Sequence, residues 1–130
     1  MSILESSFLI DILRARPEAV KLLDKIEANE HTLYIAAPTV MELWLGALES
    51  NTKEEEKNKI EELLASFIVL PLDSNSAKRA AEIESDLIRN GKIIETEDIM
   101  IAGIALSNGK TLVTRDEHFT RIPGLRVLKY

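Results

Sequence analysis

The segment TEDIMIAGIALSNGKTLVTRDE, residues 96–117, places an almost wholly apolar helical stretch directly before a short strand and a charged turn. Every residue from 99 to 106 is apolar or glycine, so a helix over 96–107 is expected to be buried on most of its sides. Gly109 is expected to end this helix, and 111–114 has the β-branched and apolar character of a strand. The segment therefore predicts a buried helix that packs on a short strand of a sheet.

The same alternation of short strands and helices continues through the rest of the chain. The predicted strands cover 2–5, 33–36, 67–70, 111–114 and, at an edge, 126–128, and the other predicted helices run from Ser6 or Ser7 to 13 and over 18–28, 38–48, 53–66 and 74–90. Short apolar strands separated by helices are typical of a parallel sheet covered on both faces. We therefore predict an α/β fold, a three-layer α/β/α domain with a central parallel sheet of four to five strands. No linker or repeat interrupts the pattern, so residues 1–130 are expected to form one domain.

Three residues are expected to mark helix ends. Ser6 or Ser7 is placed to cap the first helix and Thr96 the last, while Gly91 follows the helix over 74–90.

Composition excludes several kinds of protein. The chain of 130 residues contains no cysteine, so it has neither a disulfide nor a thiolate metal site. The net charge of −6 counts against non-specific binding to nucleic acid, but not against an enzyme that meets phosphates through metal ions. No apolar run approaches the ~20 residues that a membrane helix needs, and no signal peptide is evident. A cytoplasmic protein without membrane contact is expected.

Four acidic residues lie where parallel strands are predicted to end. Glu5 follows the first strand, Glu42 lies one turn into the helix after the second, Asp98 begins the helix before the fourth, and Asp116 follows the fourth. Ligands of such sheets bind beyond the carboxyl ends of the strands, so the four are expected to converge. Grouped carboxylates repel one another unless cations bridge them, and oxygen ligands suit Mg²⁺ or Mn²⁺. The pattern favours a metal site that activates water against a phosphodiester.

Each acid taken singly also has a simpler interpretation. Glu5 can be a solvated strand end, Glu42 part of an exposed helix stripe, Asp98 a favourable charge at a helix N-terminus, and Asp116 a turn residue. The apolar helix that Asp98 begins favours a site, because an unpaired charge beside a buried element is costly. The two histidines, His31 and His118, are interpreted as surface or local hydrogen-bonding residues.

Four segments together resemble the PIN-domain family, in particular the VapC-type toxin ribonucleases of type II toxin–antitoxin systems. They are LESSFLIDIL (4–13), PTVMELWLGA (38–47), GKIIETEDIMIAGIAL (91–106) and GKTLVTRDEHFTRIPGLRVL (109–128). The resemblance spans nearly the whole chain, and the last two segments are its most specific part. It implies a metal-dependent endoribonuclease whose catalytic acids are Glu5, Glu42, Asp98 and Asp116. Mg²⁺ or Mn²⁺ would be bound chiefly by Glu5 and Asp98, with the help of Asp116.

The resemblance also assigns roles to hydroxyl residues and to the products. Ser6, Ser7 and Thr114 would position a metal-bound water or the scissile phosphate, and cleavage would leave a 5′-phosphate and a 3′-hydroxyl. The chain departs from the family at Glu5, where Asp is usual, and at Asp116, where many members carry Asn. Because Glu5 is unusual, a PIN-like binding module without full activity remains an alternative. A metal-dependent phosphohydrolase acting on a small molecule is another.

Partners are likewise implied by the resemblance. The RNA substrate would be structured RNA such as tRNA or rRNA, and an antitoxin protein would lie in an apolar groove and reach the acids with a basic side chain. Trp44, Leu45 and Leu48 are candidates for that groove, with ordinary core or dimer packing as the alternative, and a homodimer is expected. Candidate contacts to the RNA backbone are Arg14, Lys92, Arg115 and Arg121, each of which can equally be an ordinary surface charge.

Overall fold

The computed structural model describes all 130 residues and has a parallel sheet at its centre. The sheet has five strands in the order β3-β2-β1-β4-β5. The strands are β1 (Ser2–Leu4), β2 (Tyr34–Ala36), β3 (Ile68–Leu70), β4 (Thr111–Thr114) and β5 (Val127–Lys129), and all neighbouring pairs are parallel. The predicted fold class is confirmed, and β5 lies at an edge as expected.

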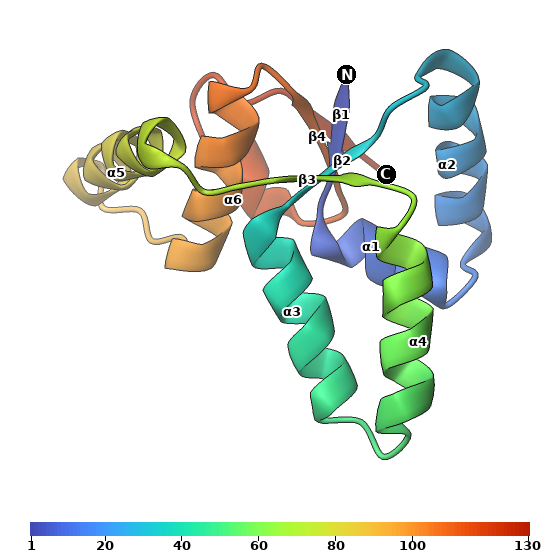
Figure 1. The fold of residues 1–130 in the computed structure, drawn as a ribbon. Coiled ribbons are helices and arrows are strands. Elements are labelled where there is room, and N and C mark those ends of the chain that lie inside the picture. The colour runs from blue at the N-terminus through green and yellow to red at the C-terminus, as the bar shows by residue number, and fades with distance from the viewer.

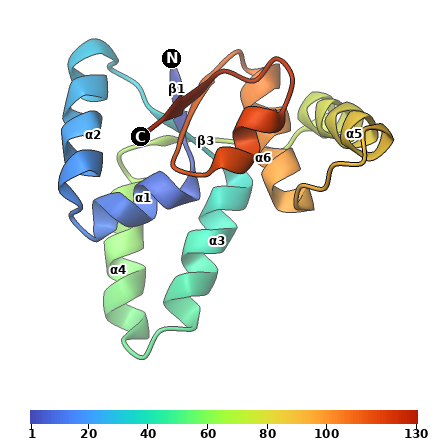
Figure 2. The ribbon, with the colours of Figure 1, turned by 180° about the vertical axis from the view of Figure 1, so that it is seen from behind.

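Helices surround this sheet on both sides. They are α1 (Ser6–Leu13), α2 (Pro17–Asn29), α3 (Ala37–Leu48), α4 (Lys53–Leu64), α5 (Ser74–Arg89) and α6 (Thr96–Ser107), with a short 3₁₀ helix η1 (Glu117–Arg121). In Figure 1, α3 and α4 form a hairpin that extends away from the sheet, with α5 and α6 on one side and α2 on the other. Figure 2 shows α1 across the end of the hairpin nearest the sheet. None of the helices is long and apolar enough to cross a membrane.

The strand residues alternate between two separate cores. Ile3, Ala36 and Leu112 belong to the core that also contains the buried residues of α5 and α6. Leu4, Ile35 and Val113, each the neighbour in sequence of one of those three, belong to the core formed with α1 to α4. This period of two is the property of a strand whose successive side chains point to opposite faces. It explains why the strands are apolar throughout and why the domain has three layers.

Gly103 sets the distance between α5 and α6. A Cβ atom on Gly103 would lie 2.6 Å from the backbone oxygen of Ser76 and 2.9 Å from the Cβ of Ala80. Gly103→Ala is expected to lower the free energy of unfolding by about 1–3 kcal/mol, because these atoms belong to helix backbones and a small side chain. Gly46→Ala is the matched control, since no atom lies within 4 Å of its Cβ position. That change is expected to stabilise the protein by about 0.5–1 kcal/mol.

Urea denaturation of the two variants beside the wild type measures both effects. A Gly103→Ala protein as stable as the wild type would mean that α5 and α6 separate without cost.

Two predicted helix caps are wrong, and one helix end is confirmed. The residues at the cap positions of α1 and α6 are Glu5 and Glu95, and neither helix has a side-chain cap. Ser6 and Thr96 are instead the first residues of their helices. Gly91 follows α5 with a φ of 67°, which favours glycine, as predicted.

Candidate active site

All four predicted acids line one pocket of about 340 Å³ at the carboxyl ends of the strands. Glu5 comes from the end of β1, Glu42 from the second turn of α3, Asp98 from the first turn of α6, and Asp116 from the turn after β4. The remaining lining residues are Ile93, Ile94, Glu95 and His118. The structure thus brings together acids from four separate segments, while the role of each acid remains a prediction.

Glu5 is buried and its carboxylate is held by two hydroxyls. Its N–H donates to the Val113 oxygen at 3.0 Å, which continues the pairing of β1 with β4 beyond the end of β1. The residue is 5% exposed. Oε1 accepts hydrogen bonds from Ser7 Oγ at 2.6 Å and Thr114 Oγ1 at 2.5 Å. A solvated strand end would not be fixed in this way, so the simpler interpretation of Glu5 does not hold.

Glu42 is half-buried and receives the other serine hydroxyl. Ser6 Oγ donates to Glu42 Oε1 at 2.8 Å. Burial raises the pKa of Glu42 from 4.5 to about 7; the Ser6 hydrogen bond opposes this shift, and the charges of Glu97 and Glu5 add to it. The two serines therefore donate to carboxylates of this pocket, and neither caps α1, whose cap position is held by Glu5.

Asp98 carries the second perturbed carboxyl group of the pocket. Burial, together with the charges of Glu5 and Asp116, raises the pKa of Asp98 from 3.8 to about 6. Desolvation and repulsion both favour the protonated form of such a group. A divalent cation bound among these acids would relieve both effects, so the donor set fits a hard cation that prefers oxygen ligands.

His118 also lines this pocket, and it is an exposed residue that bonds locally to Asp116, as predicted. Ligand atoms of Asp98, Asp116 and His118 lie within 4.8 Å of one another, which is within reach of one metal ion. The His118 N–H donates to Asp116 Oδ1 at 2.9 Å, and its Nδ1 lies 3.1 Å from the same oxygen. The available signal was its position two residues after Asp116, in a turn that follows a strand of the site.

Glu97 is a further acid that the sequence interpretation omitted. It is partly buried, and its Oε1 has no hydrogen-bond partner. Its charge helps to raise the pKa of Glu42. The acidic run Glu95, Glu97 and Asp98 at the start of α6 was the available signal. Its position beside Glu42 could not be read from that run, because it depends on how α3 and α6 pack.

The raised pKa values predict a pH-dependent effect of metal on stability. The folded state favours protonated Glu42 and Asp98, with pKa values of about 7 and about 6. The stability that this preference contributes is complete below about pH 4 and is lost as the pH rises toward 7. Mg²⁺ bound to the ionised acids is expected to restore it, so Mg²⁺ should raise Tm more at about pH 8 than at about pH 5.

Thermal unfolding with Mg²⁺, and with NaCl at equal ionic strength as the control, measures this difference. An equal Mg²⁺ effect at both pH values would contradict the assignment of the metal to these acids.

The chain also matches a known protein family. The sequence pattern of the PIN-domain family matches residues 2–125. The chain therefore belongs to the PIN-domain family.

Several of its relatives are VapC proteins, so the predicted resemblance is confirmed. The tRNA(fMet)-specific endonuclease VapC of Salmonella typhimurium is 31% identical over 125 residues, which cover 95% of this chain and 93% of that protein. The protein of the same name from Shigella flexneri is 32% identical over 124 residues, covering 95% and 92%. A chain in the crystal structure of DNA-bound VapBC from Salmonella typhimurium has a TM-score of 0.91 at 30% identity, covering 98% of this chain and 96% of that one.

Proposed function

We propose that this protein is a metal-dependent endoribonuclease, the toxin of a VapBC-type toxin–antitoxin pair. The observation that carries the proposal is the convergence of four carboxylates in one pocket at the carboxyl ends of the sheet, in a chain of the VapC type. Two of these carboxyl groups have raised pKa values, which is typical of catalytic sites. Two relatives are named as endonucleases specific for a tRNA. We therefore propose that the substrate is a structured RNA such as tRNA or rRNA.

Mg²⁺ or Mn²⁺ would be held by Asp98 and Asp116, with Glu5 or His118 completing the set, and would supply positive charge to the phosphate and an acidified water. Ser7 and Thr114 fix the carboxylate of Glu5, so its charge stays at the edge of the pocket. Ser6 orients Glu42, whose carboxylate would accept a proton from the attacking water. Attack in line on phosphorus would leave a 5′-phosphate and a 3′-hydroxyl.

Cleavage of tRNA and rRNA by protein purified free of any antitoxin tests this function. We expect cleavage with Mg²⁺ or Mn²⁺, none with EDTA, and 5′-phosphate ends. Release of phosphate from small phosphate esters is measured in parallel, because it would favour the phosphohydrolase instead. If neither metal supports RNA cleavage or phosphate release by the wild type or by Glu5→Asp, the chain is a binding module.

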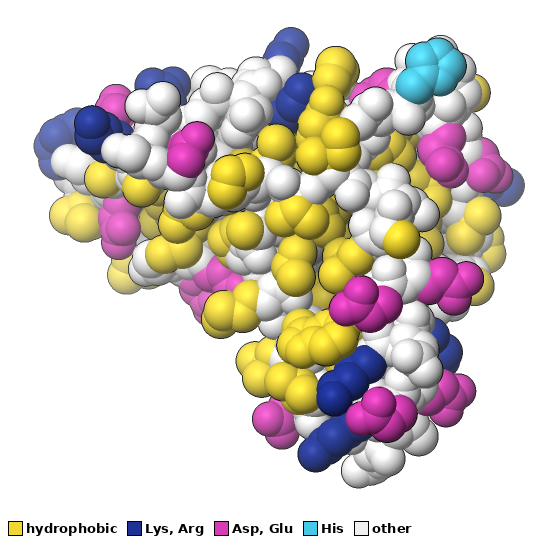
Figure 3. All heavy atoms as spheres, viewed as in Figure 1, with side chains coloured by type: hydrophobic (Ala, Val, Ile, Leu, Met, Phe, Trp, Pro, Cys, Tyr) yellow, Lys and Arg dark blue, Asp and Glu magenta, His cyan; other side chains and the backbone are white.

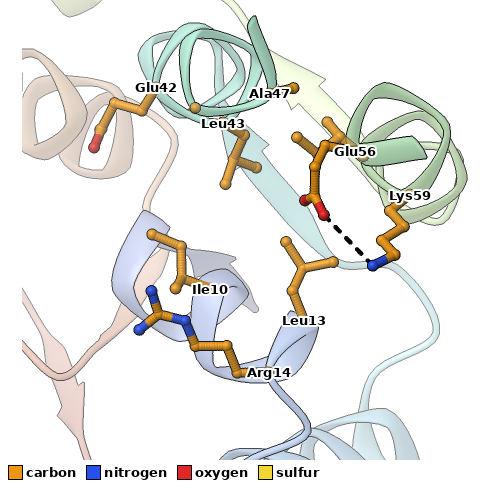
Figure 4. A pocket seen from close by; sticks show the side chains of 10 residues that line it. Ile10, Leu13, Arg14, Glu42, Leu43, Ala47, Glu56 and Lys59 are labelled. Atoms are coloured by element: carbon orange, nitrogen blue, oxygen red, sulfur yellow. Dashed lines mark hydrogen bonds and ion pairs between the residues drawn. The ribbon is translucent and has the colours of Figure 1, made fainter. Parts of the chain in front are cut away.

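A groove beside the site is the proposed position of the antitoxin. Helices α1, α3 and α4 enclose a pocket of about 420 Å³ (Figure 4). Its lining residues are Ile10, Leu13, Arg14, Glu42, Leu43, Gly46, Ala47, Glu56, Lys59 and Ile60. Trp44, Leu45 and Leu48 do not line this pocket, and their part in binding the antitoxin stays a prediction. Four residues of α3 line it on a different side of the helix: Glu42, Leu43, Gly46 and Ala47.

Glu42 lines both the groove and the acidic pocket. An apolar helix of the antitoxin in the groove would therefore bring a basic side chain to the acids and displace the metal. We expect co-expression with a small protein encoded next to this one to give a stable complex without ribonuclease activity. A complex that cleaves RNA at the rate of the free protein would contradict this arrangement.

The homodimer is proposed on the basis of an exposed apolar band. Ile68 and Val69 of β3 are 50% and 43% exposed, and Met41, Leu45 and Leu48 of α3 are also exposed. Figure 3 shows hydrophobic side chains gathered across the face on which β3 and α3 lie. Light scattering of the wild type and of Val69→Glu would show a dimer and its loss; an unaltered dimer would place the interface elsewhere.

A further inference from the structure

We propose that Asp11 is a positioning residue: it holds the guanidinium group of Arg115 beside the acidic pocket, where Arg115 binds an RNA phosphate next to the scissile one. The proposal rests on the ribonuclease function proposed above. It concerns a buried carboxylate that lies outside the acidic pocket.

Asp11 is a charged residue that α1 places in the interior. Its side chain is 2% exposed. A buried carboxylate is costly unless paired, and Asp11 has partners from two distant parts of the chain. Oδ2 accepts a hydrogen bond from the Tyr130 hydroxyl at 2.6 Å and pairs with Arg115 Nε at 3.1 Å. Oδ1 has only a long contact of 3.4 Å with Arg16 Nε.

Arg115 is fixed at both its backbone and its side chain. Its N–H donates to Ser7 Oγ at 3.1 Å, and the same hydroxyl donates to Glu5. Its ion pairs are with Asp11 alone and use Nε, while the side chain is 54% exposed. A guanidinium carries five N–H donors, so the four on its terminal nitrogens remain for a ligand. Phosphate is the group that such a planar set of donors suits.

The space beside Arg115 is polar and adjoins the acids. A pocket of about 260 Å³ is lined by Ser7, Arg115 and Asp116, without a hydrophobic residue. Asp116 also lines the acidic pocket, so the two pockets share a wall. A phosphate in the polar pocket would therefore lie one step along the backbone from a phosphate at the metal site.

Charge explains why the protein needs a fixed cation at this place. The chain has a net charge of −6 and the acids of the site repel the RNA backbone. Of the other predicted backbone contacts, Arg14 lines the groove proposed for the antitoxin and Lys92 lines a separate pocket beside α5. Arg121 lines neither the polar pocket nor the acidic one. Arg115 shares a pocket with an acid of the site, and Asp11 restricts its side chain before the substrate binds, which lowers the entropic cost of binding.

Cleavage kinetics and RNA binding at several salt concentrations test the proposal. Arg115→Ala is expected to raise KM about tenfold and to leave kcat within about twofold. It should also reduce the slope of log K against log salt by about 0.7, the value for one phosphate contact with a single strand. Arg115→Lys keeps the charge without the planar donors, so its slope should be that of the wild type and its KM intermediate.

Asp11→Asn is the variant that separates positioning from packing. It is expected to raise KM several-fold with kcat retained, because Arg115 is present but no longer fixed. Tyr130→Phe removes a hydrogen bond to the same oxygen of Asp11 but leaves the ion pair, so it should lower Tm without altering the salt slope. Arg79→Ala is the control for loss of a positive charge, since Arg79 pairs with Glu82 on α5 and its side chain is 48% exposed.

The outcomes distinguish this inference from the proposed function. Binding is measured with a labelled single-stranded RNA in EDTA, so it requires no cleavage. If the protein cuts no RNA but the slope of log K against log salt still depends on Arg115, the phosphate contact of Arg115 is supported and the ribonuclease function is overturned. If Arg115→Ala cleaves RNA with an unchanged KM and an unchanged salt slope, the inference about Arg115 is overturned and the ribonuclease function stands. If the wild type neither binds nor cleaves RNA, the inference and the proposed function are both overturned. If Asp11→Asn lowers Tm yet keeps wild-type KM and slope, Asp11 is a structural residue only. If it does not fold, the two Arg115 variants decide the phosphate contact, and Asp11→Glu, which keeps the charge but displaces the carboxylate from Arg115, decides the positioning: a raised KM supports it and an unchanged KM overturns it.

Discussion

Asp98→Asn is expected to abolish RNA cleavage while the protein stays folded. Asp98 contributes one of the ligand atoms grouped within 4.8 Å with those of Asp116 and His118. Loss of its charge removes a metal ligand, and a bound metal stabilises the transition state by several kcal/mol. The expected decrease in kcat is therefore about a thousandfold or more.

The same change is expected to stabilise the metal-free protein at neutral pH. Burial and the charges of Glu5 and Asp116 make the ionised form of Asp98 unfavourable, as its pKa of about 6 shows. Asn removes that charge at similar size, so Tm without metal should rise and the Mg²⁺ effect on Tm should disappear. Asp86→Asn, on the exposed side of α5, is the control. A cleavage rate near that of the wild type in Asp98→Asn would place the metal elsewhere.

Glu5→Gln is expected to lower kcat about a hundredfold with little change in stability. The amide oxygen of Gln can still accept the hydrogen bonds that Ser7 and Thr114 donate to Oε1 of Glu5. The substitution therefore keeps the shape of the site and removes only the charge that an oxygen-preferring cation requires. Cleavage kinetics with Mg²⁺ and Mn²⁺, together with Tm, measure the two effects. An unchanged kcat would mean that Glu5 serves only to orient the hydroxyls.

Glu5→Asp tests the length of this side chain. The extra methylene of Glu displaces the carboxylate by about 1.5 Å unless the side chain folds back, whereas catalytic groups tolerate about 0.5 Å. We therefore expect Glu5→Asp to raise kcat while Mg²⁺ binding persists. A fall in kcat would show instead that Ser7 and Thr114 have adapted the site to Glu.

Much of the fold follows from local patterns. The apolar stretches 2–5, 33–36 and 111–114 alternate with amphipathic or apolar helices, and that alternation requires a parallel sheet. Errors occur at helix ends, where Ser6 and Thr96 have the composition of caps but lie inside the helices. The choice depends on what else a hydroxyl can bind. For Ser6 the answer is Glu42, which is 36 positions away in the sequence.

The meeting of the four acids was predictable for the same reason as the sheet. Parallel strands end at one edge, so residues that follow strands approach each other without knowledge of any particular contact. The lining of the groove could not be predicted from the sequence, because the apolar residues of α3 do not by themselves reveal which side of the helix faces α1 and α4. That orientation is decided by packing between helices.

From the sequence one can predict the succession of strands and helices along the chain, the edge of the sheet at which the acids lie, and the class of ligand that they suit. These depend on hydrophobic periodicity and on residue type, both of which are local. The folded structure is needed to show which hydroxyl donates to which carboxylate, that His118 lies beside Asp98, and that Asp11 binds Arg115 and Tyr130. Thr114 and Glu5 are 109 positions apart, and contacts at such separations exist only once the strands have paired. The raised pKa values of Glu42 and Asp98 have the same origin, because burial and mutual repulsion arise when the chain is folded.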